Sequence, residues 1–105
     1  MITINGVSWE LWFVSPYNNN LYRSDGSRTI GMCDSFTRRI YISETLRGYM
    51  LKKVLCHELV HASMFSYRVY LTEEQEELVA DLLATYGEEI IEKTNLIFSK
   101  LRNGY

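Results

Sequence analysis

The chain has 105 residues, of which 47% are hydrophobic and 23% charged, a composition ordinary for one small globular domain. We therefore expect a single domain spanning residues 1–105. The net charge of −2 provides no strongly basic face, which argues against nucleic acid as the main partner. The sequence contains neither a run of about 18 apolar residues nor an export signal, so we expect a cytoplasmic protein without a membrane span.

The first part of the chain, residues 1–43, has the pattern of strands separated by turns. Val7 to Val14 is rich in β-branched and aromatic residues and predicts a strand that ends before Pro16. Ile40 to Ile42 predicts another strand, and Arg28 to Met32 is a further candidate. We expect these segments to form a small, mostly antiparallel sheet.

A helix is predicted next, with Ser43 as its N-cap and with Gly48 weakening its first turns. From Val54 to Phe65 this helix is apolar nearly all round, which is typical of a helix buried on most sides. Polar side chains inside such a segment need a partner, because burying them unpaired is costly.

Three polar residues of this helix form the motif H-E-x-x-H, with His57, Glu58 and His61. The chain has only these two histidines, and a spacing of four places both on one helix face, where they can bind one ion. Neutral imidazole is a preferred ligand of Zn²⁺. Glu58 points roughly 100° around the helix from His57, beside the ion rather than on it, where a general base is needed. The alternative is an ordinary helix with two histidines and no metal.

A second helix begins at Thr72, because Thr72-Glu73-Glu74-Gln75 fits the capping box. Its pattern continues to about residue 94 and could extend to Leu101. Residues 73–92 contain eight acidic residues and no basic one. A catalytic zinc site needs three protein ligands and no third histidine exists, so this helix is the expected source of a carboxylate ligand.

Within the acidic segment, Glu77 and Asp81 lie one helical turn apart on one face. Small residues at positions 80, 84 and 87 lie beside them and would let the second helix approach the first closely. This geometry favours Glu77 as the third ligand. Glu74 and Glu76 are expected at exposed positions of the same helix.

The two cysteines, Cys33 and Cys56, are expected to be free thiols, as in most cytosolic proteins. Cys56 lies in the apolar helix and is expected to act as a small buried hydrophobic residue. Cys33 lies in a loop-like segment and is an alternative metal ligand, because thiolate binds zinc.

H-E-x-x-H followed on a later helix by E-x-x-x-D resembles the gluzincin metallopeptidases, and in particular very small soluble gluzincins and the ImmA/IrrE-type metallopeptidases of phages and mobile elements. The resemblance covers roughly residues 28–90. It implies an α+β, zincin-like domain in which the sheet packs on two helices carrying the zinc site. It also implies that the strand at Ile40–Ile42 offers its edge to an extended substrate.

By this resemblance His57, His61 and Glu77 would bind Zn²⁺, Glu58 would be the general base, and Asp81 would bind a ligand histidine. Tyr67, Tyr70 and Tyr86 are candidates for stabilising the transition state. The implied function is hydrolysis of a peptide or protein substrate, such as a regulator encoded by a phage or mobile element. The alternative function is a metal-stabilised interaction domain with little hydrolytic activity.

Overall fold

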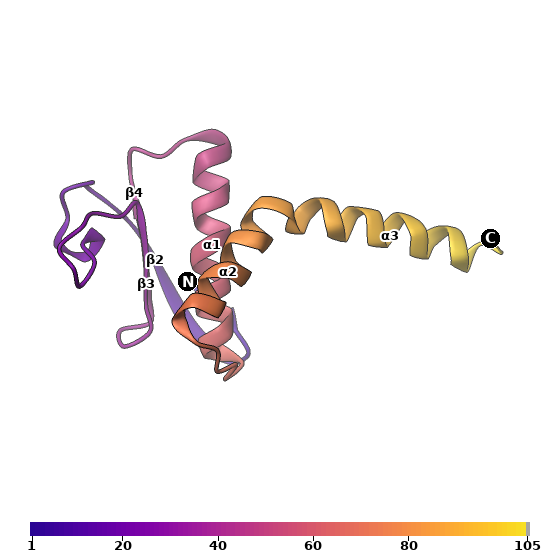
Figure 1. Ribbon diagram of the computed structural model, residues 1–105, viewed down its shortest axis with the longest axis horizontal. Helices are drawn as coiled ribbons and strands as arrows, with labels where there is room; N and C mark the ends of the chain where they lie inside the picture. Colours follow the sequence, from indigo (N-terminus) through magenta and orange to yellow (C-terminus); the bar gives the residue numbers. More distant parts are fainter. Residues whose placement is uncertain (105) are drawn as a thin grey trace.

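The computed structural model describes residues 1–104 and has an α+β fold, in which a sheet packs against α1 and α1 packs against α2 (Figure 1). The elements in chain order are β1 (Ile2–Ile4), β2 (Val7–Val14), the 3-10 helix η1 (Asn19–Leu21), β3 (Gly31–Asp34), β4 (Arg39–Ser43), α1 (Gly48–Ser66), α2 (Glu73–Leu82), the π-helical η2 (Leu83–Gly87) and α3 (Glu88–Arg102). The α+β class predicted from the sequence is confirmed.

The sheet has four strands in the order β1-β2-β4-β3. β1 and β2 are antiparallel, as are β3 and β4, whereas β2 and β4 are parallel, so the sheet is mixed with two of its three pairings antiparallel. β4 has a hydrogen-bonded strand on each side, so the expectation that Ile40–Ile42 offers a free edge is wrong. The edge strand next to β4 is β3.

The core lies between the sheet and α1. Trp9, Ile40 and Ile42 from the sheet pack with Val54 and Ala62 from α1, and all five are buried. Trp9 Nε1 donates a hydrogen bond to Ser66 Oγ (2.9 Å), and the Ser66 hydroxyl donates to the Ala62 carbonyl (2.7 Å). The indole thereby has the partner that a buried N–H requires, and β2 is tied to the end of α1.

The helix starts differ in how well the sequence predicts them. Ser43 is not a cap: it ends β4, is buried, and its Oγ lies 2.8 Å from Thr45 Oγ1. α1 begins instead at Gly48, which has a φ of +56° that glycine adopts readily. The capping box of α2 is confirmed, since Thr72 and Gln75 exchange the two expected hydrogen bonds.

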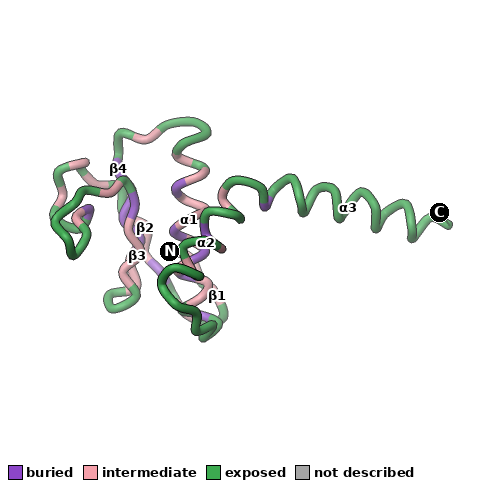
Figure 2. Tube along the Cα trace, in the orientation of Figure 1, coloured by how far each residue is buried: buried purple, intermediate pink, exposed green. Residues whose placement is uncertain are grey.

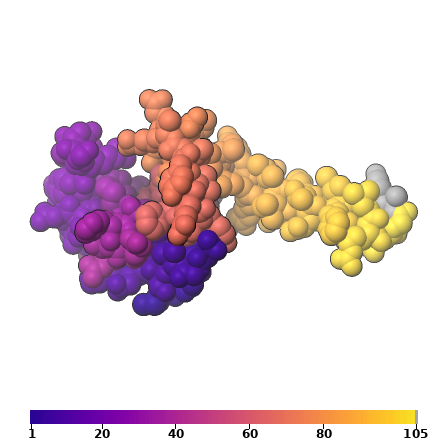
Figure 3. Space-filling view, turned by 90° about the horizontal axis from the view of Figure 1, so that it is seen from below, coloured from indigo at the N-terminus to yellow at the C-terminus, as the bar shows by residue number. Residues whose placement is uncertain are grey.

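The second predicted helix is interrupted by η2, after which α3 extends away from the body as an arm (Figures 1 and 3). Figure 2 shows the contrast in burial between α1 and this arm. The arm raises the radius of gyration to 15.9 Å, against about 13 Å for a compact chain of this length. Among residues 1–104, no helix is both long and apolar enough to cross a membrane.

The network of Trp9 and Ser66 predicts a large effect of one hydroxyl. Ser66→Ala removes the acceptor of a buried N–H, so we expect the free energy of unfolding to fall by about 1–3 kcal/mol in denaturant titrations. Ser63→Ala, on the same helix but outside this network, is the matched control and should change it by less than about 0.5 kcal/mol. Equal effects of the two substitutions would contradict the structural role of Ser66.

Candidate metal centre

The two histidine side chains of the H-E-x-x-H motif face α2 across the contact between the two helices. His57 Nε2 lies 3.2 Å from Glu77 Oε2, and His61 Nε2 lies 2.9 Å from Glu77 Oε1. The two Nε2 atoms are 3.2 Å apart. The histidine side chains are only 20% and 16% exposed, so α2 shields them from solvent while Glu77 remains half-exposed at the rim. The structure thus brings the three predicted ligands together.

The spacing of these donor atoms fits a small metal ion. One ligand atom from each of His57, His61 and Glu77 can be chosen so that all lie within 4.8 Å of one another. A tetrahedral zinc with ligands at about 2.0–2.1 Å keeps its donor atoms roughly 3.3 Å apart, close to the separations found here. Two imidazoles and one carboxylate are also a ligand set of catalytic zinc sites.

The hydrogen bonds of the other ring nitrogens determine what the converging atoms can do. His57 Nδ1 lies 3.0 Å from Asp81 Oδ1, and His61 Nδ1 lies 2.7 Å from Glu76 Oε1. An ionised carboxylate only accepts hydrogen bonds, so each Nδ1 donates, and in a neutral ring Nε2 is then an acceptor. Two acceptor nitrogens and the Glu77 carboxylate therefore face one point, and a bound cation would relieve their mutual repulsion.

Glu76 is a residue that the sequence interpretation placed wrongly. We expected it at an exposed position, but its side chain is 26% exposed and it binds His61. Asp81 contacts a ligand histidine as expected, although its own side chain is 69% exposed. The two carboxylates have parallel roles, each orienting one imidazole. Glu76 was not predicted because helix geometry was applied to one line of approach between the helices, whereas His57 and His61 are contacted from both sides of Glu77.

Glu58 lies on the sheet side of the two histidines and is 7% exposed. Burial raises the pKa of its carboxyl above the ordinary value, and Glu77 adds to this, while His57, His61 and Arg23 act in the opposite direction. The space for Glu58 exists because β3 has glycine at position 31. A Cβ there would lie 3.0 Å from Glu58 Oε2 and 2.7 Å from Val54 Cγ1. Gly31 is therefore a site residue that the sequence interpretation did not identify.

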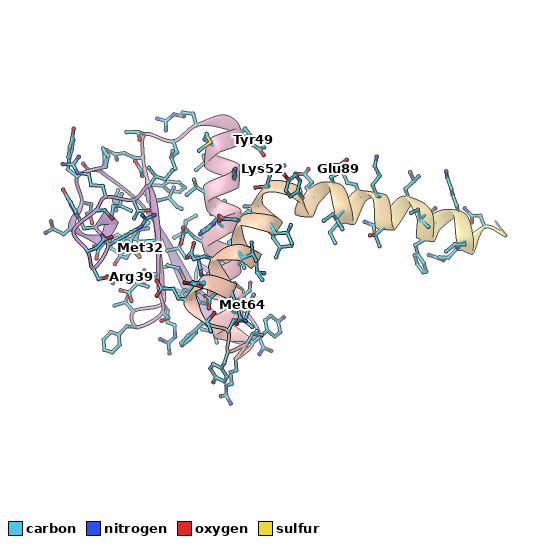
Figure 4. The ribbon with its side chains drawn as sticks, in the orientation of Figure 1. Met32, Arg39, Tyr49, Lys52, Met64 and Glu89 are labelled. Atoms are coloured by element: carbon cyan, nitrogen blue, oxygen red, sulfur yellow. The ribbon has the colours of Figure 1, made fainter. Side chains whose placement is uncertain are left out.

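A cleft of about 720 Å³ opens beside Glu58 and the histidines. One wall is the edge strand β3, from Gly31 to Cys33, and the opposite wall is formed by the start of α2. The loops before β3 and after α1 close its ends, with Arg23 on one and Tyr70 on the other. Figure 4 places Met32, which also lines this cleft, on the sheet side of α1.

The lining of the cleft distinguishes the three tyrosine candidates. Of the three candidates, Tyr70 lines the cleft, whereas Tyr67 lines a separate groove on α1 and Tyr86 belongs to η2.

Cys33 and Cys56 are free thiols, as expected. Cys33 lies in β3 rather than in a loop, on the cleft wall, where burial and the nearby Glu58 and Glu76 raise its pKa to about 12, and the group of donor atoms that could hold a metal consists of His57, His61 and Glu77.

Comparison of the chain with models of known families, with curated proteins and with solved structures finds no match. The chemical interpretation of this site therefore depends on the geometry of its side chains.

Carboxylate substitutions should separate the metal ligand from the orienting residues. The unmodified chain is expected to bind about one zinc, and Glu77→Ala should weaken zinc affinity most, because it removes one of three ligands. Glu76→Ala and Asp81→Ala should each weaken it by about 10–100-fold. Exposed Glu74 is the control, and Glu74→Ala should leave affinity unchanged. Competition titration with a chromophoric chelator gives this ranking, and an equal loss for Glu74→Ala and Glu77→Ala would contradict the site.

Gly31 should be sensitive to a single added methyl group. Gly31→Ala forces Val54 and Glu58 to shift, so we expect about 1–3 kcal/mol of destabilisation from overpacking. Val54→Ala removes the closer of the two contacts, so the double variant should lose less stability than the sum of the single variants. Strict additivity in denaturant titrations would show that Gly31 does not set this contact.

Proposed function

We propose that the protein is a zinc-dependent metallopeptidase of gluzincin type, with a zincin-like arrangement of its sheet and helices. The observation that carries the proposal is the convergence of two imidazoles and a carboxylate next to the buried carboxyl of Glu58, at the wall of an open cleft. His57, His61 and Glu77 would bind the metal ion. Zinc in such a site polarises a carbonyl group and makes water a better nucleophile.

Glu58 is proposed as the general base. It is one residue from His57 in sequence, lies off the line of the three ligands, and borders the cleft. A carboxyl whose pKa is raised by burial is a better proton acceptor near neutral pH than an exposed one. In this mechanism Glu58 takes a proton from the attacking water and delivers it to the leaving amine.

The substrate is proposed to be an extended peptide segment of a peptide or protein. The support for this is the free edge of β3, which can pair with an added strand and leads past Gly31 to Glu58. Of the tyrosines considered, Tyr70 borders the same cleft and is the proposed hydrogen-bond donor to the transition state, and Arg23 on the facing loop adds a positive charge.

The test of this function is Glu58→Gln, which keeps the shape of the side chain but removes the base. We expect unchanged zinc content and a fall in hydrolysis of about 10²-fold or more, measured by mass spectrometry on a peptide library. Glu74→Gln is the matched control and should retain full activity, since Glu74 lies outside the cleft.

Two outcomes would overturn the peptidase proposal. Hydrolysis that survives Glu58→Gln unchanged would exclude this base. A zinc-loaded wild-type chain that cleaves no library peptide would favour the alternative, an interaction domain in which the metal only stabilises the fold.

A further inference from the structure

The arm formed by α3 has an apolar side that no other part of residues 1–104 covers. None of its residues is buried, and it is tied to the body at its first turn, where Glu88 pairs with Lys52 of α1 at 2.6 Å. Of the six large apolar side chains of α3 that are between 51% and 58% exposed, all but Leu96 lie on one side of the helix: Ile90, Ile91, Ile97, Phe98 and Leu101. We call these five residues the α3 stripe.

Together with Thr94, residues of the α3 stripe have the spacing of a helix–helix contact. Ile90, Thr94, Ile97 and Leu101 follow one another at intervals of four, three and four residues, the alternation of a heptad seam. At about 100° per residue, these positions together with Ile91 and Phe98 cover roughly 120° of the helix surface. Isolated exposed apolar residues are normal on protein surfaces, but a continuous row of this kind marks a contact surface.

The charges of α3 indicate which partner fits. Its first half contains Glu88, Glu89 and Glu92 together with Lys93, and its second half contains Lys100 and Arg102 with no acidic residue. The charges of the helix sum to zero, so α3 has no net attraction for an anionic membrane. A second α3 lying antiparallel would place the acidic half of each helix against the basic half of the other. A parallel arrangement would place like charges together.

We propose that α3 packs antiparallel against α3 of a second copy of this chain, through the α3 stripe. Ile90 of each copy then lies near Leu101 of the other, and Thr94 lies near Ile97. The contact is self-complementary, as a two-fold dimer requires. Because each arm leads away from its own body (Figure 3), the two bodies would lie at opposite ends of the pair. A contact along one helix of about 22 Å is smaller than a standard interface, so we expect dissociation constants of about 1–100 µM.

The first experiment is sedimentation equilibrium of the full chain from about 1 to 500 µM, which brackets the expected range. Ile97→Glu places a charge in the α3 stripe and should weaken dimerisation by about 100-fold or more. Leu96→Glu is the matched control, because Leu96 is also about half-exposed (52%) but lies on the opposite side of the helix. It should change the dissociation constant by less than about threefold.

The orientation is tested by charge exchange. A basic variant (Glu89→Lys with Glu92→Lys) and an acidic variant (Lys93→Glu with Lys100→Glu) should each dimerise at least about tenfold more weakly than the wild type. Mixed in equal amounts, they should form a heterodimer. Raising sodium chloride from about 0.05 to 0.5 M should weaken the wild-type dimer, because it screens the opposite charges that an antiparallel pair brings together.

Other results would contradict the antiparallel dimer. A monomer up to about 500 µM, or a dimer unaffected by Ile97→Glu, would overturn it. Association that strengthens with salt would replace the antiparallel arrangement by a parallel one. Binding of the monomer to phosphatidylglycerol vesicles, abolished by Ile97→Glu but not by Leu96→Glu, would assign the α3 stripe to a membrane surface instead.

Discussion

The structure depends on the contact between α1 and α2, in which three acceptor groups converge on one point. His57, His61 and Glu77 cannot satisfy one another while both imidazoles donate from Nδ1 to Asp81 and Glu76. Two hydrogen bonds, from His57 Nδ1 to Asp81 and from His61 Nδ1 to Glu76, therefore hold the second helix against the first, and the acceptor atoms between them favour a cation. Because metal binding and helix docking use the same residues, binding free energy at this site would contribute directly to the stability of the fold.

Close packing on both sides of α1 makes this arrangement possible. On one side, Gly31 lets β3 approach Val54 and Glu58 at distances that any larger residue would prevent. On the other side, Ala80 is completely buried where α2 meets α1. The polar residues of α1 are thereby enclosed between a strand and a helix, and Glu58 acquires the burial that raises its pKa. The small side chains at Gly31 and Ala80 thus allow the close packing that buries Glu58 and raises its pKa.

Local patterns predicted the parts of this structure that depend on local physics. The strand Val7–Val14 and the capping box at Thr72 are found as expected, because side-chain type and backbone hydrogen bonding decide them within a few residues. The one-turn spacing of His57 and His61 also needed no tertiary information. Tertiary information was needed to predict which carboxylates contact the two histidines. Helix geometry alone identified Glu77 but not Glu76.

The remaining errors have a common origin in long-range packing. Serine is a residue type that favours the N-cap position, but the pairing of β4 with β2 extends to Ser43 and places it in the sheet. The free edge belongs to β3 because β4 is paired on both sides, an order that no local pattern encodes. The π-helical η2 was likewise not predicted, because the apolar pattern of the second helix continues through it.

The eight acidic residues of positions 73–92 would repel one another on an isolated helix, and the structure shows how part of that charge is balanced. Glu76, Glu77 and Asp81 face the imidazoles, and Glu88 faces Lys52. In α3, Glu89 lies one helical turn before Lys93, whereas Lys100 and Arg102 lie more than one turn beyond Glu92. In the proposed antiparallel pair, Lys100 and Arg102 of the second chain would lie near these acidic residues. The order of charges along α2 and α3 thus separates the carboxylates that face the imidazoles from the residues of the proposed self-association.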